Sequence, residues 1–118
     1  MSVGAAIRIS SPDAERVILH AAEFARQQGT PCYVISVVRE LPHGETVRRN
    51  LELIAESKST PVIQEGDDIA KTLLAVARGF GVRTLFLKSG SSHGLGRSIA
   101  EQLLYLDPPF DVVIVGSE

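Results

Sequence analysis

Short apolar runs alternate with amphipathic segments of helical period from one end of this chain to the other. The strongest run, PCYVISVV at residues 31–38, is almost continuously apolar and rich in β-branched residues, as expected of a strand that a parallel sheet buries on both faces. Four more strands are predicted at residues 5–9, 61–66, 83–87 and 111–115, with a helical segment between successive strands. This alternation predicts an α/β fold, an open five-stranded parallel sheet with right-handed crossovers and four helices on both faces.

Local signals mark where the first two helices begin and end. Ser11 is a suitable N-cap, Pro12 fits the first helical position, and Gly29 follows the apolar repeat that begins at Val17. The second helix is expected over residues 44–57, where apolar residues again recur at helical spacing.

The third and fourth helices carry similar signals. Asp67 is expected to cap the third helix, which closes near Gly79. Ser98 and Glu101 have the S-x-x-E spacing of a capping box, so the fourth helix is expected to begin at Ile99. The glycine- and serine-rich stretch before that helix therefore connects it to the fourth strand.

The composition is typical of one soluble domain. A length of 118 residues with 44% hydrophobic and 22% charged residues suits a single domain over residues 1–118. No apolar run approaches the roughly 20 residues of a membrane span, so membrane insertion is not expected. The N-terminus lacks a secretory signal pattern, and the single cysteine, Cys32, allows no intrachain disulfide. We therefore expect a cytoplasmic chain in which Cys32 is a core thiol.

The charge pattern and the histidines argue against several function classes. The formal net charge is −2 and the basic residues are dispersed, whereas nucleic-acid binding needs a basic patch. His20, His43 and His93 lie far apart, and no histidine or cysteine spacing indicates a metal site. No activated nucleophile or acid–base pair is visible. No catalytic residue is therefore assigned, and a hydrolase is the least supported of the functions considered.

The stretch KSGSSHGLGRS, residues 88–98, has features that suit a phosphorylated ligand. Ligands of open parallel sheets bind beyond the carboxyl ends of the strands, where the strand order reverses. If the first strand is central and the fourth lies beside it, this stretch and the SSPD turn after the first strand are both expected there. Glycines let phosphate oxygens approach the backbone, serines add hydroxyl donors, and cations neutralise charge. The residues concerned are Lys88, Ser91, Ser92, Gly94, Gly96, Arg97 and Ser98.

A connection without a ligand is the alternative for the same stretch. Loops rich in glycine and serine are common in α/β proteins, and Ser98 is fully explained as a helix cap. Neither the P-loop pattern G-x-x-x-x-G-K-[ST] nor the dinucleotide pattern G-x-G-x-x-G occurs. The stretch by itself leaves phosphate binding open.

In the order of its elements and in several local motifs, the whole chain resembles the universal stress protein family, especially the divergent universal-stress domain of potassium-sensing histidine kinases. The segments that carry the resemblance are AAIRISSPDAERVILHAAEFARQQGTPCYVISVV, DDIAKTLLAVARGFGVRTLFLKSG and GRSIAEQLLYLDPPFDVVIVG. The resemblance implies the strand order 3-2-1-4-5 and a homodimer formed through the last strand, Asp111 to Gly116. It also implies, as in many members, an adenine nucleotide held without rapid turnover.

ATP-binding members of that family carry G-x2-G-x9-G-[ST] after the fourth strand. In this chain Gly94 matches the second glycine, Gly96 and Ser98 match the last pair, and Gly90 matches the first glycine only with altered spacing. The nine-residue span is reduced to Leu95. The resemblance thus implies a shortened phosphate loop.

Two further positions belong to the site that the resemblance implies. Ser10, followed by Ser11, stands where ATP-binding members have an aspartate after the first strand, and Val37 matches the residue whose backbone reads the adenine edge. We therefore expect a regulatory or stress-response domain that binds ATP, AMP or a cyclic dinucleotide. The alternative is an interaction module of the same fold that binds no nucleotide, either free-standing or as a domain of a sensor kinase or transporter.

Overall fold

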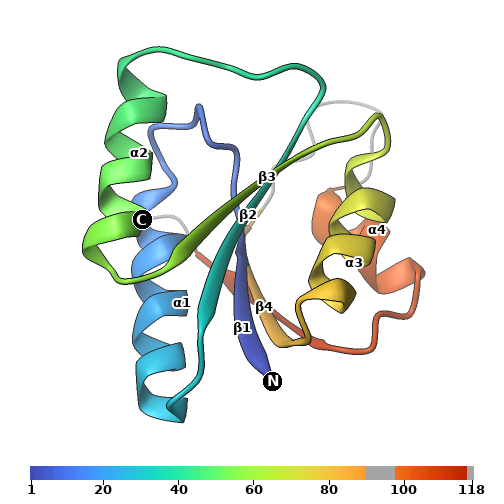
Figure 1. The fold of residues 1–118 in the computed structure, drawn as a ribbon. Coiled ribbons are helices and arrows are strands. Elements are labelled where there is room, and N and C mark those ends of the chain that lie inside the picture. Colours follow the sequence, from blue (N-terminus) through green and yellow to red (C-terminus); the bar gives the residue numbers. More distant parts are fainter. Residues whose placement is uncertain (90–97, 117–118) are drawn as a thin grey trace.

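A five-stranded parallel sheet forms the centre of the molecule (Figure 1). The computed structural model describes residues 1–89 and 98–116. The strand order is β3-β2-β1-β4-β5, so the predicted α/β fold and the order 3-2-1-4-5 are confirmed. The strands are β1 (Ser2–Ala6), β2 (Cys32–Val38), β3 (Thr60–Glu65), β4 (Val82–Lys88) and β5 (Asp111–Val115).

Two helices cover each face of the sheet, as the alternation of elements predicts (Figure 1). On one face lie α1 (Glu15–Gln28) and α2 (Glu45–Glu56), and on the other lie α3 (Ile69–Gly79) and α4 (Ile99–Tyr105). In the described part of the chain, no helix combines the length and the apolar character needed to cross a bilayer.

Each face of the sheet has its own hydrophobic core, and β2 contributes to both. Val34 packs into the core that contains Ile18 and Ile54 of α1 and α2. Its neighbour Ile35 packs into the core that contains Leu103 of α4. Successive residues of a strand point to opposite faces, so this alternation confirms that residues 31–38 supply a strand buried on both sides.

The first strand lies closer to the N-terminus than the predicted residues 5–9. The amide of Ser2 already donates to the carbonyl of Gly81, which extends the pairing to the start of the chain. At the other end, the amide of Ile9 donates at 3.0 Å to Oγ of Ser36, a side chain, instead of continuing the ladder. Residues 7–9 are therefore the start of the loop that leads to α1.

The first helix begins later than Ser11 predicts. Ala14 occupies the N-cap position and no side chain caps the helix. Oγ of Ser11 instead accepts a hydrogen bond from the amide of Asp13 at 3.2 Å, so Ser11 and Pro12 belong to the turn before the helix. The prediction of Ser11 as the cap is wrong. The other end is as predicted, since Gly29 closes α1 in the left-handed conformation, with φ at 66°.

The predicted cap of α4 is confirmed, whereas the predicted cap of α3 is wrong by one residue. Asp68, and not the predicted Asp67, caps α3, because the extended backbone at Asp68 lets its carboxylate accept from the amide of Lys71 at 3.1 Å. Ser98 caps α4 as predicted, and its Oγ accepts from the amide of Glu101 at 3.1 Å.

Candidate functional site

A cleft of about 1060 Å³ lies at the carboxyl ends of the central strands. It is lined by residues from the ends of β1, β2 and β4 and from the starts of α1, α3 and α4. The strand order reverses here, because β2 and β3 extend the sheet on one side of β1, whereas β4 and β5 extend it on the other side. Ligands of open parallel sheets bind at such a reversal. The cleft therefore lies where the fold favours a binding site.

The loop between β1 and α1 forms one wall of this cleft. Arg8, Ile9, Ser10 and Ser11 all line it. The side chain of Ile9 is 2% exposed and belongs to the core under α1 and α2, whereas Ser10 is exposed. The loop is thus anchored by an apolar side chain and presents a polar one.

Asn50 on α2 holds this loop in place by hydrogen bonds from the interior of the protein. Its side chain is buried, and Nδ2 donates to the carbonyl oxygens of Ile9 and Ser11, each at 2.8 Å. The buried Ser36 on β2 accepts from the amide of Ile9. Buried carbonyl groups that lose their donors are costly, so these bonds fix the path of the loop. Side chains from two separate elements therefore position this wall.

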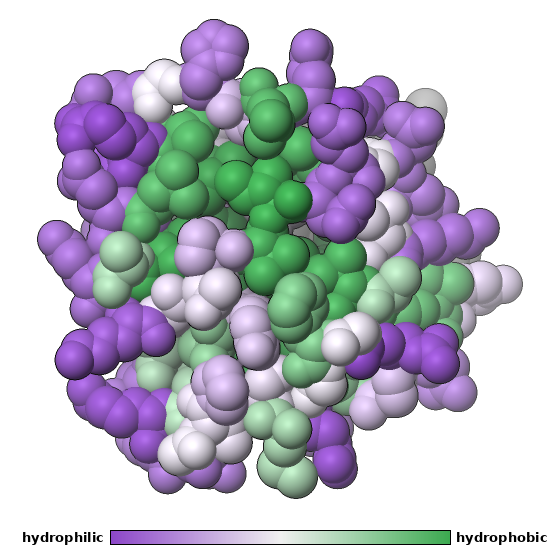
Figure 2. Space-filling model, in the orientation of Figure 1, coloured by the Kyte–Doolittle hydropathy of each residue, from purple (hydrophilic) through white to green (hydrophobic). Residues whose placement is uncertain are grey.

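The end of β2 also contributes to the lining of the cleft. Val37 and Arg39 line it there, and the buried side chains of Ile35, Leu73 and Leu87 add apolar lining. Figure 2 shows hydrophobic side chains gathered in the upper middle of the view, between α2 and α3, with hydrophilic side chains around them. Apolar lining inside a polar rim suits a ligand that has both a flat apolar part and a charged part.

The end of β4 brings a cation to the cleft. Lys88 and Ser89 line the cleft, as does Ser98 at the start of α4. Nζ of Lys88 lies 2.9 Å from Oδ2 of Asp13, which belongs to the loop before α1. This ion pair links two elements that are 75 residues apart in the sequence.

The described part of the lining carries a small excess of positive charge. Its basic side chains are Arg8, Arg39 and Lys88, and its acidic side chains are Asp13 and Glu40. Such a balance favours a small anionic ligand and does not form the broad basic surface that nucleic acids require.

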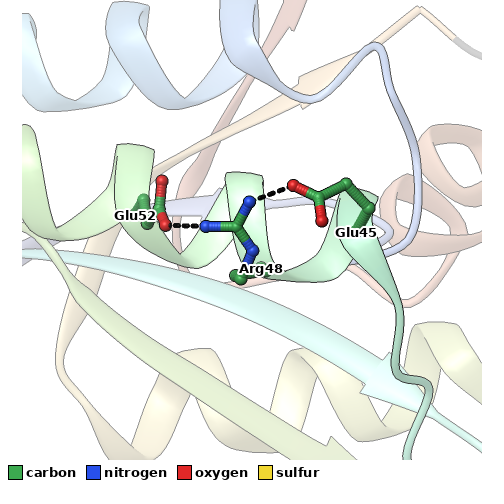
Figure 3. Close-up of polar contacts among 3 residues, drawn as sticks. All are labelled: Glu45, Arg48 and Glu52. Carbon is green, nitrogen blue, oxygen red and sulfur yellow. Dashed lines mark hydrogen bonds and ion pairs between the residues drawn. The ribbon is translucent and has the colours of Figure 1, made fainter.

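A second group of charges lies on α2 and takes no part in the cleft (Figure 3). Arg48 forms ion pairs with Glu45 and with Glu52, which are three and four residues away on the same helix. The hydrogen bond that Arg48 donates to the Glu45 carboxylate and the negative charge of that carboxylate raise the pKa of Arg48. These pairs support the exposed side of the helix whose buried side carries Asn50.

Cys32 lies outside the cleft, and its predicted burial in the core is confirmed. Burial raises the pKa of its thiol, although a hydrogen bond with Ser59 acts in the opposite direction. Across residues 1–89 and 98–116, no group of three His, Cys, Asp or Glu side chains could hold a metal ion.

Five of the predicted site residues line this one cleft, and the other six lie outside the described residues. The residues in the lining are Ser10, Ser11, Val37, Lys88 and Ser98. Those outside the described part are Gly90, Ser91, Ser92, Gly94, Gly96 and Arg97.

Sequence reasoning missed several residues that shape the cleft. Asn50 carried a usable signal, because it lies between Val47 and Ile54 at helical spacing and is therefore a polar residue on a buried helix face. Arg39 follows β2 directly, at the edge of the sheet where ligands bind, and its position alone could have identified it. Arg8 lies two residues after the end of β1, but it was missed because the first strand was predicted at residues 5–9.

Several solved structures superpose on nearly the whole chain. A universal stress protein from Archaeoglobus fulgidus has a TM-score of 0.71 at 19% identity, over 97% of this chain and 92% of that one. The universal stress protein from Archaeoglobus fulgidus in complex with dAMP has a TM-score of 0.70 at 20% identity, over 97% and 96%. A universal stress protein in complex with cAMP has a TM-score of 0.74 at 15% identity, over 99% and 98%. No protein-family model matches the sequence, and neither does any curated protein.

Replacing Asn50 by alanine is expected to lower the free energy of unfolding by about 1–3 kcal/mol, because it leaves one buried and one partly buried carbonyl group without their donor. Urea unfolding measures the loss. Gln64→Ala is the control, since it removes one exposed hydrogen bond to the neighbouring Glu65 carbonyl and should change the same quantity by less than about 0.5 kcal/mol. A loss at Asn50 no larger than the loss at Gln64 would contradict the role of Asn50 in holding the loop.

Proposed function

Because this chain has the universal stress protein fold, we propose that it is a regulatory or stress-response domain that binds an adenine-containing nucleotide. The ligands proposed are ATP, AMP or a cyclic dinucleotide, held without rapid turnover. The same domain can act alone or as part of a sensor kinase or transporter.

The observation that carries this proposal is the cleft at the reversal of strand order. Its lining combines apolar side chains with hydroxyl groups and a cation. Its volume of about 1060 Å³ lies just above the roughly 300–1,000 Å³ typical of ligand pockets. The complexes of universal stress proteins with dAMP and with cAMP support the choice of an adenine nucleotide for this fold.

Each part of the cleft has a proposed role in binding. The backbone of Val37 would read the adenine edge, the hydroxyl groups of Ser10 and Ser11 would donate to the sugar or phosphate, and Lys88 would neutralise phosphate charge. The remaining proposed phosphate contacts come from the stretch after β4, namely Gly90, Gly94, Gly96, Arg97 and Ser98.

We propose binding and not catalysis because of the side chains that the described cleft lining contains. It holds no histidine and no cysteine, and one of its two carboxylates, Asp13, is paired with Lys88. The other, Glu40, is exposed on the rim. A carboxylate in such surroundings is a poor general base, although slow hydrolysis of ATP is compatible with the arrangement.

Isothermal titration calorimetry with AMP, ATP and cyclic di-AMP tests this function. At least one of them is expected to bind, and Lys88→Met is expected to weaken that binding about tenfold, which corresponds to about 1.4 kcal/mol, because a cation at the phosphate is lost. Lys58→Met is the matched control, because Lys58 lies between α2 and β3 and does not line the cleft. Absence of binding by all three nucleotides at millimolar concentration would contradict the proposed function.

A second proposed function is assembly through β5. Both β3 and β5 are edge strands of the sheet, but they differ in character. β3 contains Pro61, a residue that protects sheet edges, whereas Val113 and Ile114 of β5 are 37% and 45% exposed. An exposed apolar edge strand favours pairing with a second copy. We propose a homodimer through Asp111 to Gly116.

Sedimentation equilibrium tests the dimer. The unmodified protein is expected to show the mass of two chains, and Ile114→Lys to show the mass of one, because a charge would be buried between the paired strands. Gln64→Lys places the same side chain on the β3 edge and should leave the dimer intact. A wild-type protein that stays monomeric at high micromolar concentration would rule the assembly out.

A further inference from the structure

We propose that Asp13 competes with the anionic group of a cleft ligand for Lys88 and thereby sets how strongly the cleft prefers phosphorylated ligands. This inference rests on the proposed function, since it concerns the same cleft. It adds a specificity-determining residue, because Asp13 would weaken the binding of a nucleotide without weakening the binding of the corresponding nucleoside.

The geometry places Asp13 at the position of a competitor. Both Asp13 and Lys88 line the cleft, and their charged atoms are 2.9 Å apart. The turn before α1 holds Asp13 close to the cleft wall, since its amide donates to Oγ of Ser11. The carboxylate of Asp13 is therefore paired with the ammonium group to which a phosphate in the cleft would bind.

The pair is weak enough to be exchanged. The side chain of Lys88 is 40% exposed and that of Asp13 is 63% exposed, so water screens their attraction. A phosphate offers more charge and more acceptor oxygens than a carboxylate and can therefore displace it. The displacement has a cost, because Lys88 gives up one partner and Asp13 stays near the bound anion.

The other charges in the described lining do not share this arrangement. Arg8 and Arg39 are exposed and form no ion pair with another described residue. Glu40 carries the same charge as Asp13 but forms no ion pair with Lys88 or with any other described cation. A neutral variant of Glu40 therefore separates the general effect of charge from competition for Lys88.

Calorimetric titration with AMP and with adenosine tests the competition in the wild type, Asp13→Asn and Glu40→Gln. Asp13→Asn is expected to bind AMP about three- to tenfold more tightly than the wild type, because Lys88 becomes available and a like charge is removed. Its affinity for adenosine should stay within about twofold, since adenosine has no anionic group. Glu40→Gln removes a negative charge from the same lining but frees no cation, so it should tighten AMP binding by no more than about twofold, less than Asp13→Asn does.

Dependence on Lys88 completes the test. In the Lys88→Met background, Asp13→Asn is expected to raise the affinity for AMP by less than about twofold, which a double-mutant cycle measures as coupling between the two residues. Asp13→Ser provides a second uncharged variant with a different side chain, and thermal unfolding checks that each variant folds.

The outcomes separate this inference from the proposed function. If the wild type binds AMP but Asp13→Asn binds it no more tightly, or if the full gain persists in Lys88→Met, the competition is overturned while the proposed function stands. If neither the wild type nor Asp13→Asn binds AMP, adenosine, ATP or cyclic di-AMP, the proposed function and the competition are both overturned.

Discussion

The position of β1 in the middle of a parallel sheet is the constraint on which the rest of the structure depends. β1 pairs with both β2 and β4, and at its central residue, Gly4, the packing leaves little room for a side chain. A Cβ added at Gly4 would lie 2.9 Å from Cδ1 of Leu85 and 3.2 Å from Cγ1 of Val82. The chain continues from β2 to α2 on one face of the sheet and from β4 to α4 on the other face (Figure 1). The cleft therefore opens between these connections, at the carboxyl end of β1.

A few polar contacts give this cleft its shape. Asn50 and Ser36 fix the loop between β1 and α1, and the ion pair between Lys88 and Asp13 links that loop to the end of β4. The hydrogen bonds of Asn50 and Ser36 are buried or partly buried, whereas the ion pair is exposed. The wall of the cleft is therefore rigid where it meets the core, and its charges remain exchangeable where they meet solvent.

The sequence was sufficient to predict the strands, the helices and their alternation, because each element has a strong local period and its own end signals. It was insufficient for the loop after β1. Ser11 is a good N-cap by local rules, yet Asn50, 39 residues later, binds its carbonyl and α1 begins only at Glu15. Lys88 could be predicted as a cleft residue from its place after a strand, but its partner Asp13 is set by tertiary structure.

Backbone amide chemical shifts recorded during a titration with AMP test the central claim, that the cleft at the end of β1 binds an adenine nucleotide. We expect the largest changes at residues 8–11, 13, 37–40 and 88–89, which line the cleft. Changes concentrated instead on the shallow groove formed by Gln64, Lys71 and Val76 would contradict this binding site, as would no change at millimolar AMP and, in parallel titrations, at millimolar ATP and cyclic di-AMP.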